Sequence, residues 1–144
     1  MSVYADSSFL VSCHLTDVNT PTAKAYLLNT SSPLIFTALQ ALEVRNGFQL
    51  SVFRGLLPMT NAKAAWVSLG QDLRSGRLLK MAVNWPLAFR IASQISDRHS
   101  SIIGTRSLDI LHVAAAKSLR AVEFVSFDGR QRKVAAAVGL RVAP

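Results

Sequence analysis

The sequence is poor in cysteine and in acidic residues. A single cysteine, Cys13, among 144 residues excludes an intramolecular disulfide framework and a Cys-rich zinc site. Asp and Glu together number 8 against 16 Lys and Arg, for a formal net charge of +8. The chain opens on no basic-then-apolar signal segment and holds no uncharged apolar run of about 18 residues. We therefore expect a cytoplasmic protein with no membrane partner.

Other features bound the architecture. Half of the residues (50%) are hydrophobic, which supports a packed core and excludes a disordered chain. No repeat, linker or low-complexity tract is visible, and the length matches the ~100–200 residues of a usual domain. We predict a single domain over residues 1–144. The excess of cations favours a phosphate-rich or acidic partner.

Short β-prone runs alternate with segments that carry helix signals. Strands are predicted at 3–5, 34–36, 122–127 and 140–142, and the apolar stretch 78–83 is either strand or connector. Helices are predicted from Phe9 onward and at 21–29, 37–54, 61–75, 86–95, 108–119 and 130–138, with a polar loop over 97–104. Such alternation implies a mostly parallel sheet with helices on both faces, an α/β three-layer sandwich.

Helix starts are marked by capping residues. Thr37 and Gln40 have the spacing of a capping box, in which each side chain satisfies a backbone N–H of the other. Thr60 is expected to cap the helix 61–75, and Ser107 or Thr105 the helix 108–119.

Two carboxylates follow predicted strands. Asp6 ends the run 3–5, and Asp128 ends the run 122–127. The carboxyl ends of parallel strands share one edge of the sheet, where ligands bind in open α/β folds. We expect the two side chains to lie together there. The structural alternative is that Asp6 caps a helix and Asp128 forms an Asp-Gly turn.

Two further acids lie near helix starts. Asp109 has almost only apolar neighbours over 108–114, and a buried carboxylate needs a cation or hydrogen-bond donors. The alternative is partial neutralisation by the helix N-terminus. Glu43 lies near the start of the helix 37–54, where a solvated face is the alternative.

Together the four acids predict a metal site. Carboxylates that face one another stay ionised only when a cation neutralises them. Oxygen-only ligation favours Mg²⁺ or Mn²⁺ over zinc, and such ions promote phosphodiester hydrolysis. We predict a nuclease site that consists of Asp6, Glu43, Asp109 and Asp128.

Four blocks of the sequence, in order, resemble those of PIN-domain nucleases. They are Val3–Val11, Pro33–Thr37 with Leu42-Glu43, Thr105–Ala116, and Val125–Gln131 with Val138–Leu140. Size and layout are similar to VapC-type toxins of bacterial toxin–antitoxin pairs. In place of the Thr more common in the family, this chain has Ser126, which keeps the hydroxyl.

The resemblance implies a PIN-like fold and a Mg²⁺- or Mn²⁺-dependent endoribonuclease that cuts RNA. It also implies a VapB-type antitoxin that blocks the site. Asp6, Glu43, Asp109 and Asp128 would be both the catalytic and the metal-binding residues.

A basic cluster follows the last of these acids. Arg130, Arg132 and Lys133 are predicted to contact RNA phosphates, and a solvated helix face is the alternative. His112 shares a helix face with Asp109 and is expected in the core or behind the acids, with a role as catalytic base as the alternative.

Aromatic and apolar residues in the middle of the chain are assigned to packing. Trp66 and Trp85 could stack on bases, but core or dimer packing is preferred. Leu56, Leu57 and Trp66 make a homodimer plausible, and residues 54–98 are expected to select the substrate.

Three other functions are compatible with parts of this pattern. They are a housekeeping RNA-processing nuclease, a non-catalytic RNA-binding module on the same fold, and a phosphotransfer enzyme of the haloacid-dehalogenase type. The last needs a second Asp two residues after the strand-end Asp, and this chain has Ser8 there.

Overall fold

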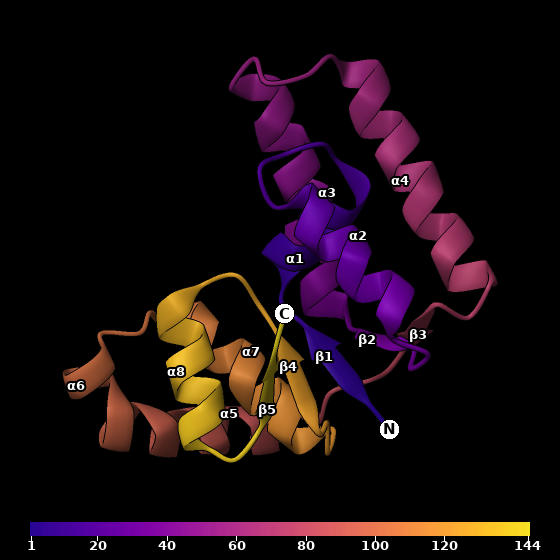
Figure 1. The fold of residues 1–144 in the computed structure, drawn as a ribbon. Coiled ribbons are helices and arrows are strands. Elements are labelled where there is room, and N and C mark those ends of the chain that lie inside the picture. The colour runs from indigo at the N-terminus through magenta and orange to yellow at the C-terminus, as the bar shows by residue number, and fades with distance from the viewer. The chain divides into compact units, whose positions relative to one another are not determined.

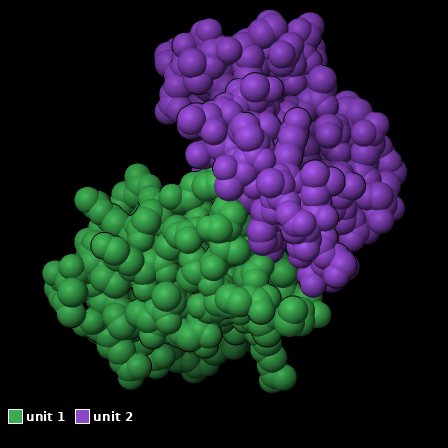
Figure 2. All heavy atoms as spheres, viewed as in Figure 1, with its two compact units in different colours: residues 1–6, 82–144 green, residues 7–81 purple.

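The computed structural model describes all 144 residues. Two compact units are present (Figure 2): unit 1 consists of residues 1–6 and 82–144, and unit 2 of residues 7–81. The five strands are divided between them, and every pair formed within a unit is parallel. The predicted α/β class, a parallel sheet flanked by helices, is confirmed.

Unit 1 contains three strands and five helical segments (Figure 1). The strands are β1 (Val3–Ala5), β4 (Glu123–Val125) and β5 (Arg141–Ala143). The helices are α5 (Trp85–Ile95), the π-helical η1 (Ser96–Ser100), α6 (Ser101–Ile103), α7 (Ser107–Ser118) and α8 (Gly129–Ala137). β4 lies between β1 and β5. Helix α7 packs against α5 and α8, and α8 packs against β4 and β5.

The core of unit 1 is built on β1 and β4, which are apolar except for Glu123. All residues of β1 and β4 are buried, as expected for parallel strands covered on both faces. The register pairs Tyr4 with Phe124, whose rings stack at 5.7 Å. Tyr4 Oη also lies 2.9 Å from Nδ1 of buried His112. The predicted core position of His112 is confirmed.

Unit 2 contains two strands and four helices. The strands are β2 (Leu34–Phe36) and β3 (Leu78–Lys80). The helices are α1 (Ser7–His14), α2 (Thr20–Asn29), α3 (Ala38–Phe53) and α4 (Met59–Arg74). Helix α1 packs against the other three helices. A Cβ at Gly47 of α3 would lie 3.0 Å from Val11 Cγ2 in α1, so a larger residue here would require the Val11 side chain to shift.

The capping predictions had mixed outcomes. The capping box of Thr37 and Gln40 at the start of α3 is confirmed in both directions. The other two caps are wrong. Helix α4 begins at Met59, one residue before Thr60, because Pro58 already has the extended backbone of an N-cap. Helix α7 has Arg106 at its N-cap position and no side-chain cap.

The predicted loop over 97–104 is also wrong. The chain there continues α5 as η1 and α6, since no glycine or proline interrupts it before Gly104. Gly104 has φ +74°, the left-handed conformation that ends helices. The stretch left open at 78–83 forms β3 at its start.

The two tryptophans are half-buried, so neither belongs to the core. Trp66 contacts Phe48 edge-on, and the Arg45 guanidinium lies 4.0 Å from its ring centroid. Trp85 contacts Phe89, which is exposed. No helix combines the length and apolar character needed to cross a membrane.

Candidate active site

Asp6 is placed by the sheet register. Its N–H donates to Val125 O at 2.9 Å, which extends the pairing of Ala5 with Val125 by one residue and sets Asp6 opposite Ser126. The Ser126 hydroxyl lies 2.8 Å from Asp6 Oδ2. Asp6 is 5% exposed, so the register of two strands fixes a buried carboxylate against a hydroxyl donor.

Asp128 is the N-cap of α8. Its Oδ1 accepts from Gln131 N at 2.9 Å, and its own N–H donates to Ser126 Oγ at 3.0 Å. The hydroxyl of Ser126 therefore contacts groups of both strand-end acids. The prediction that Asp6 and Asp128 lie together is consistent with this shared contact, and Asp128 also has a structural role in α8.

Asp109 lies in the first turn of α7 and is paired with a cation. Arg106 Nε donates to Asp109 Oδ2 at 2.9 Å, with the Arg106 side chain 78% exposed. This hydrogen bond and the charge of Asp109 raise the pKa of the Arg106 guanidinium, Asp128 adds a smaller effect, and desolvation opposes them. The sequence predicted that Asp109 needs a cation or hydrogen-bond donors, and Arg106 supplies the cation.

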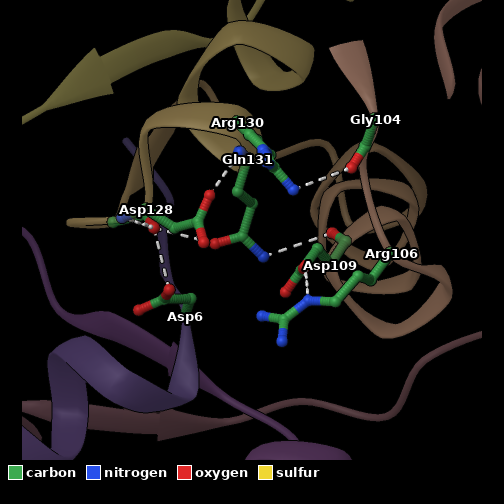
Figure 3. A network of polar contacts seen from close by, with 8 residues as sticks. Asp6, Gly104, Arg106, Asp109, Asp128, Arg130 and Gln131 are labelled. Carbon is green, nitrogen blue, oxygen red and sulfur yellow. Dashed lines mark hydrogen bonds and ion pairs between the residues drawn. The ribbon is translucent and has the colours of Figure 1, made fainter. Parts of the chain in front are cut away.

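Gln131 connects these acids from α8. Its Oε1 lies 2.8 Å from Ser126 Oγ, and its Nε2 donates to the main-chain oxygen of Asp109 at 3.2 Å. Figure 3 shows the amide between Asp128 and Asp109. Sequence reasoning assigned Gln131 no role, although Asp128-x-x-Gln131 has the same spacing as the capping box of α3.

Glu43 lies in unit 2, on α3. Its Oε1 accepts from Ser7 Oγ at 3.2 Å, and Ser7 directly follows Asp6 in the chain. Both residues line a cavity of about 440 Å³ whose lining includes Ser8 and Arg54. Three of the four predicted acids are thus linked within unit 1, and the fourth lies in unit 2.

The residues of the basic cluster after Asp128 differ in their contacts with the main chain. Arg132 Nη1 donates to the main-chain oxygens of Ser126 and Pro144, each at 2.9 Å. Arg130 Nη1 donates to Gly104 O at 3.4 Å, and both Arg130 and Lys133 are exposed. Arg132 is therefore held by the backbone, whereas Lys133 extends toward solvent.

The donor chemistry of unit 1 fits a hard divalent cation. Asp6, Asp109 and Asp128 offer only oxygen, the donor that Mg²⁺ and Mn²⁺ prefer. When ionised, these carboxylates exceed the charge of Arg106 by two. The structure gathers no group of three or more His, Cys, Asp or Glu side chains that could hold a metal ion.

Comparisons with known proteins identify the family. The model of the PIN domain matches residues 3–137, and no curated protein sequence matches the chain. VapC20 of Mycobacterium tuberculosis has a similar structure, with TM-score 0.68, 20% identity and 99% of both chains covered. FitAcB from Neisseria gonorrhoeae (TM-score 0.66, 19% identity) and VapBC2 from Rickettsia felis (0.66, 12%) match over 99% of this chain and 96% and 97% of theirs. Because the family model matches residues of both units and the fold is parallel α/β, the chain belongs to the PIN-domain family.

Proposed function

We propose that this protein is a Mg²⁺- or Mn²⁺-dependent endoribonuclease that hydrolyses RNA phosphodiester bonds. The observation that carries the proposal is the network in which Ser126 and Gln131 join Asp6, Asp109 and Asp128. Such a surplus of carboxylate charge in a protein of net charge +8 suits a metal centre that acts on a polyanion.

Asp6, Asp109 and Asp128 of unit 1 and Glu43 of unit 2 are the proposed metal-binding and catalytic residues. Glu43 is included because Pro33–Thr37 with Leu42-Glu43 resembles a block of the family, and the PIN-domain match covers these residues. A bound divalent ion would supply the Lewis acidity that phosphodiester hydrolysis needs. The chain itself contributes the Ser126 hydroxyl, which orients Asp6. The family match spans both units, which supports a single domain over 1–144.

The basic residues are proposed to seat the RNA backbone. Arg130 and Lys133 are exposed on α8, directly after Asp128. Cations there attract phosphates without reading the base sequence. Arg132 already donates to two main-chain oxygens, so its contribution to RNA binding is the one that most needs a test.

We further propose that the chain acts in the cytoplasm as the toxin of a toxin–antitoxin pair. VapC20, a structural neighbour, is described as a Sarcin-Ricin loop cleaving toxin, and VapBC2 as bound to a DNA fragment from its promoter. These likenesses support a VapB-type antitoxin as partner. A homodimer is also proposed; Leu56 is 72% exposed and available for such packing. Light scattering of the purified protein tests the dimer.

Cleavage of RNA by the purified protein tests the activity. We expect cleavage with Mn²⁺ or Mg²⁺, loss of cleavage with EDTA, and loss in Asp6→Asn. Equal cleavage by the wild type with EDTA, or by Asp6→Asn, would refute the proposal. Growth arrest on expression, relieved by the product of an adjacent small gene, tests the toxin role. Cleavage without growth arrest would indicate a housekeeping nuclease.

A non-catalytic RNA-binding module is the second candidate. It is favoured by the ion pair that already neutralises Asp109 and by the lack of an assembled metal-binding group. Calorimetric titration with Mn²⁺ separates the two functions. A protein that binds RNA but gives no heat with Mn²⁺ would be the non-catalytic module.

A further inference from the structure

Gln131 is a buried polar side chain with no role in the proposed chemistry. It is 1% exposed, and burial of an amide is costly unless its donor and acceptor are both satisfied. A leucine or methionine of similar size would fill the same space without that requirement. Packing alone therefore does not account for a hydrogen-bonded amide at this position.

Helix capping does not explain them. Gln40 and Gln131 occupy the same position, three residues after the N-cap of α3 and of α8. In α3 the Gln40 side chain accepts from the N-cap N–H of Thr37 at 2.7 Å and completes the box. In α8 the equivalent N–H, that of Asp128, donates to Ser126 Oγ instead. The Gln131 side chain is thereby released from capping.

The released amide spans two elements that carry acids. Its acceptor faces Ser126 Oγ at the end of β4, the group that also contacts Asp6 Oδ2. Its donor meets the main-chain oxygen of Asp109 in α7. The backbone of Gln131 is fixed in turn by Asp128 Oδ1. One side chain thus ties the start of α7 to the strand end where Asp6 and Asp128 lie.

The amide also gives the Ser126 hydroxyl a second acceptor. Ser126 is fully buried, and its single proton has two acceptors at the same 2.8 Å, Asp6 Oδ2 and Gln131 Oε1. If a bound cation were to occupy Asp6 Oδ2, the Ser126 hydroxyl could donate to Gln131 Oε1 instead. The buried hydroxyl would then keep a hydrogen-bond acceptor.

We propose that Gln131 is a positioning residue that holds Asp109 in register with Asp6 and Asp128 for metal binding. This inference rests on the proposed nuclease function. Groups that orient metal ligands typically change metal affinity or activity by about 10–100-fold when they are removed.

Gln131→Met tests the proposal, because methionine keeps the unbranched shape and removes both hydrogen bonds. Thr20→Val in unit 2 is the matched control: Thr20 is buried, its hydroxyl proton has Ser12 O and Leu15 O as acceptors, and its oxygen accepts from Asp17 N. We expect both variants to fold with similar losses of thermal stability. Only Gln131→Met should bind Mn²⁺ about tenfold more weakly and lose kcat to the same extent, with the KM for an RNA oligonucleotide within twofold of wild type. Mn²⁺ affinity and kcat within twofold of wild type would overturn the proposal.

A metal-free measurement separates this inference from the proposed function. In backbone amide spectra without metal, Gln131→Met should shift the resonances of Asp6, Asp109 and Asp128, and Thr20→Val should not. Unshifted resonances in Gln131→Met overturn the positioning role. A wild type that neither binds Mn²⁺ nor cleaves RNA overturns the nuclease function, and the spectra still decide the role of Gln131.

If Gln131→Met is too unstable to purify, Gln131→Glu replaces it. Glutamate keeps the length and an acceptor for Ser126, but as a carboxylate it cannot donate to Asp109 O. Its added negative charge by itself favours cation binding, so weaker Mn²⁺ binding than wild type would support loss of position. Tighter binding would refute it.

Discussion

The Ser126 hydroxyl lies 2.8 Å from Asp6 Oδ2, although 120 residues separate them in the chain. The contact follows from the parallel register of β1 and β4, which continues through the bond from Asp6 N to Val125 O. A shift of one residue in this register would turn Asp6 to the opposite face of the sheet. The geometry of the candidate site therefore depends on the pairing of two three-residue strands.

Removal of this hydroxyl should destabilise the fold. Ser126→Ala takes a donor from buried Asp6 and an acceptor from the N–H of Asp128. We expect the free energy of unfolding to fall by about 1–3 kcal/mol, as for buried groups that lose a partner. Urea denaturation measures the change. Ser126→Thr keeps the hydroxyl and should lose clearly less, so equal losses in the two variants would contradict the assigned role.

Two substitutions of Asp128 should separate its structural role as a helix cap from its chemical role in metal binding. Asparagine caps helices about as well as aspartate, so Asp128→Asn should preserve the bond from Gln131 N and the stability of α8 to within about 0.5 kcal/mol. Loss of the carboxylate charge should still abolish metal-dependent RNA cleavage. Asp128→Ala loses both roles and should cost about 1 kcal/mol in addition.

Thermal unfolding and a cleavage assay on the same preparations check this pair of variants. Wild-type cleavage by Asp128→Asn would show that Asp128 serves only as a helix cap.

Local sequence patterns predicted the strand-end acids but not their partners. An apolar run followed by Asp marks both Asp6 and Asp128, because strand direction then fixes where each carboxylate lies. Gln131 has the capping spacing, yet its side chain does not accept from the N-cap N–H of Asp128. It donates instead to the main-chain oxygen of Asp109, 22 residues earlier. Only the packing of α7 against α8 brings that acceptor within reach.

The errors at helix boundaries likewise arise from residues outside the local capping pattern. Thr60 and Ser107 are good capping residues, but Pro58 and Arg106 occupy the N-cap positions. For α7, the ion pair of Arg106 with Asp109 stabilises the first turn without a cap. The polar composition of 97–104 suggested a loop, whereas chain continuity up to Gly104 kept it helical.

Arg106 should compete with metal for Asp109. Its guanidinium is charged at all working pH values, and the hydrogen bond with Asp109 raises its pKa further. Arg106→Gln removes this competitor, and we expect Mn²⁺ affinity to rise by about twofold to fivefold, the scale of an exposed ion pair. Calorimetry at low and at high salt measures the effect, which should shrink as salt screens the pair.

Arg98→Gln is the control, because Arg98 is exposed and has no ion pair with an acid of the candidate site. Weaker Mn²⁺ binding in Arg106→Gln than in this control would mean that Arg106 supports the metal site instead of competing with it.

The basic cluster on α8 should divide into an anchor and RNA contacts. Arg132 holds the main-chain oxygens of Ser126 and Pro144, so Arg132→Met should loosen the C-terminal strand β5. Faster amide exchange over residues 141–143, with little change in RNA binding, is the expected result. Lys133 has no such bond to lose, and Lys133→Gln should affect RNA binding alone.

The salt dependence of RNA affinity distinguishes these roles. Each phosphate contact to single-stranded RNA contributes about 0.7 to the slope of log affinity against log salt. Lys133→Gln should lower the slope by about that amount and leave amide exchange unchanged, while Arg132→Met should do the reverse. A reduced slope in Arg132→Met without faster exchange would make Arg132 an RNA contact. Its bonds to Ser126 and Pro144 would then not be needed to stabilise β5.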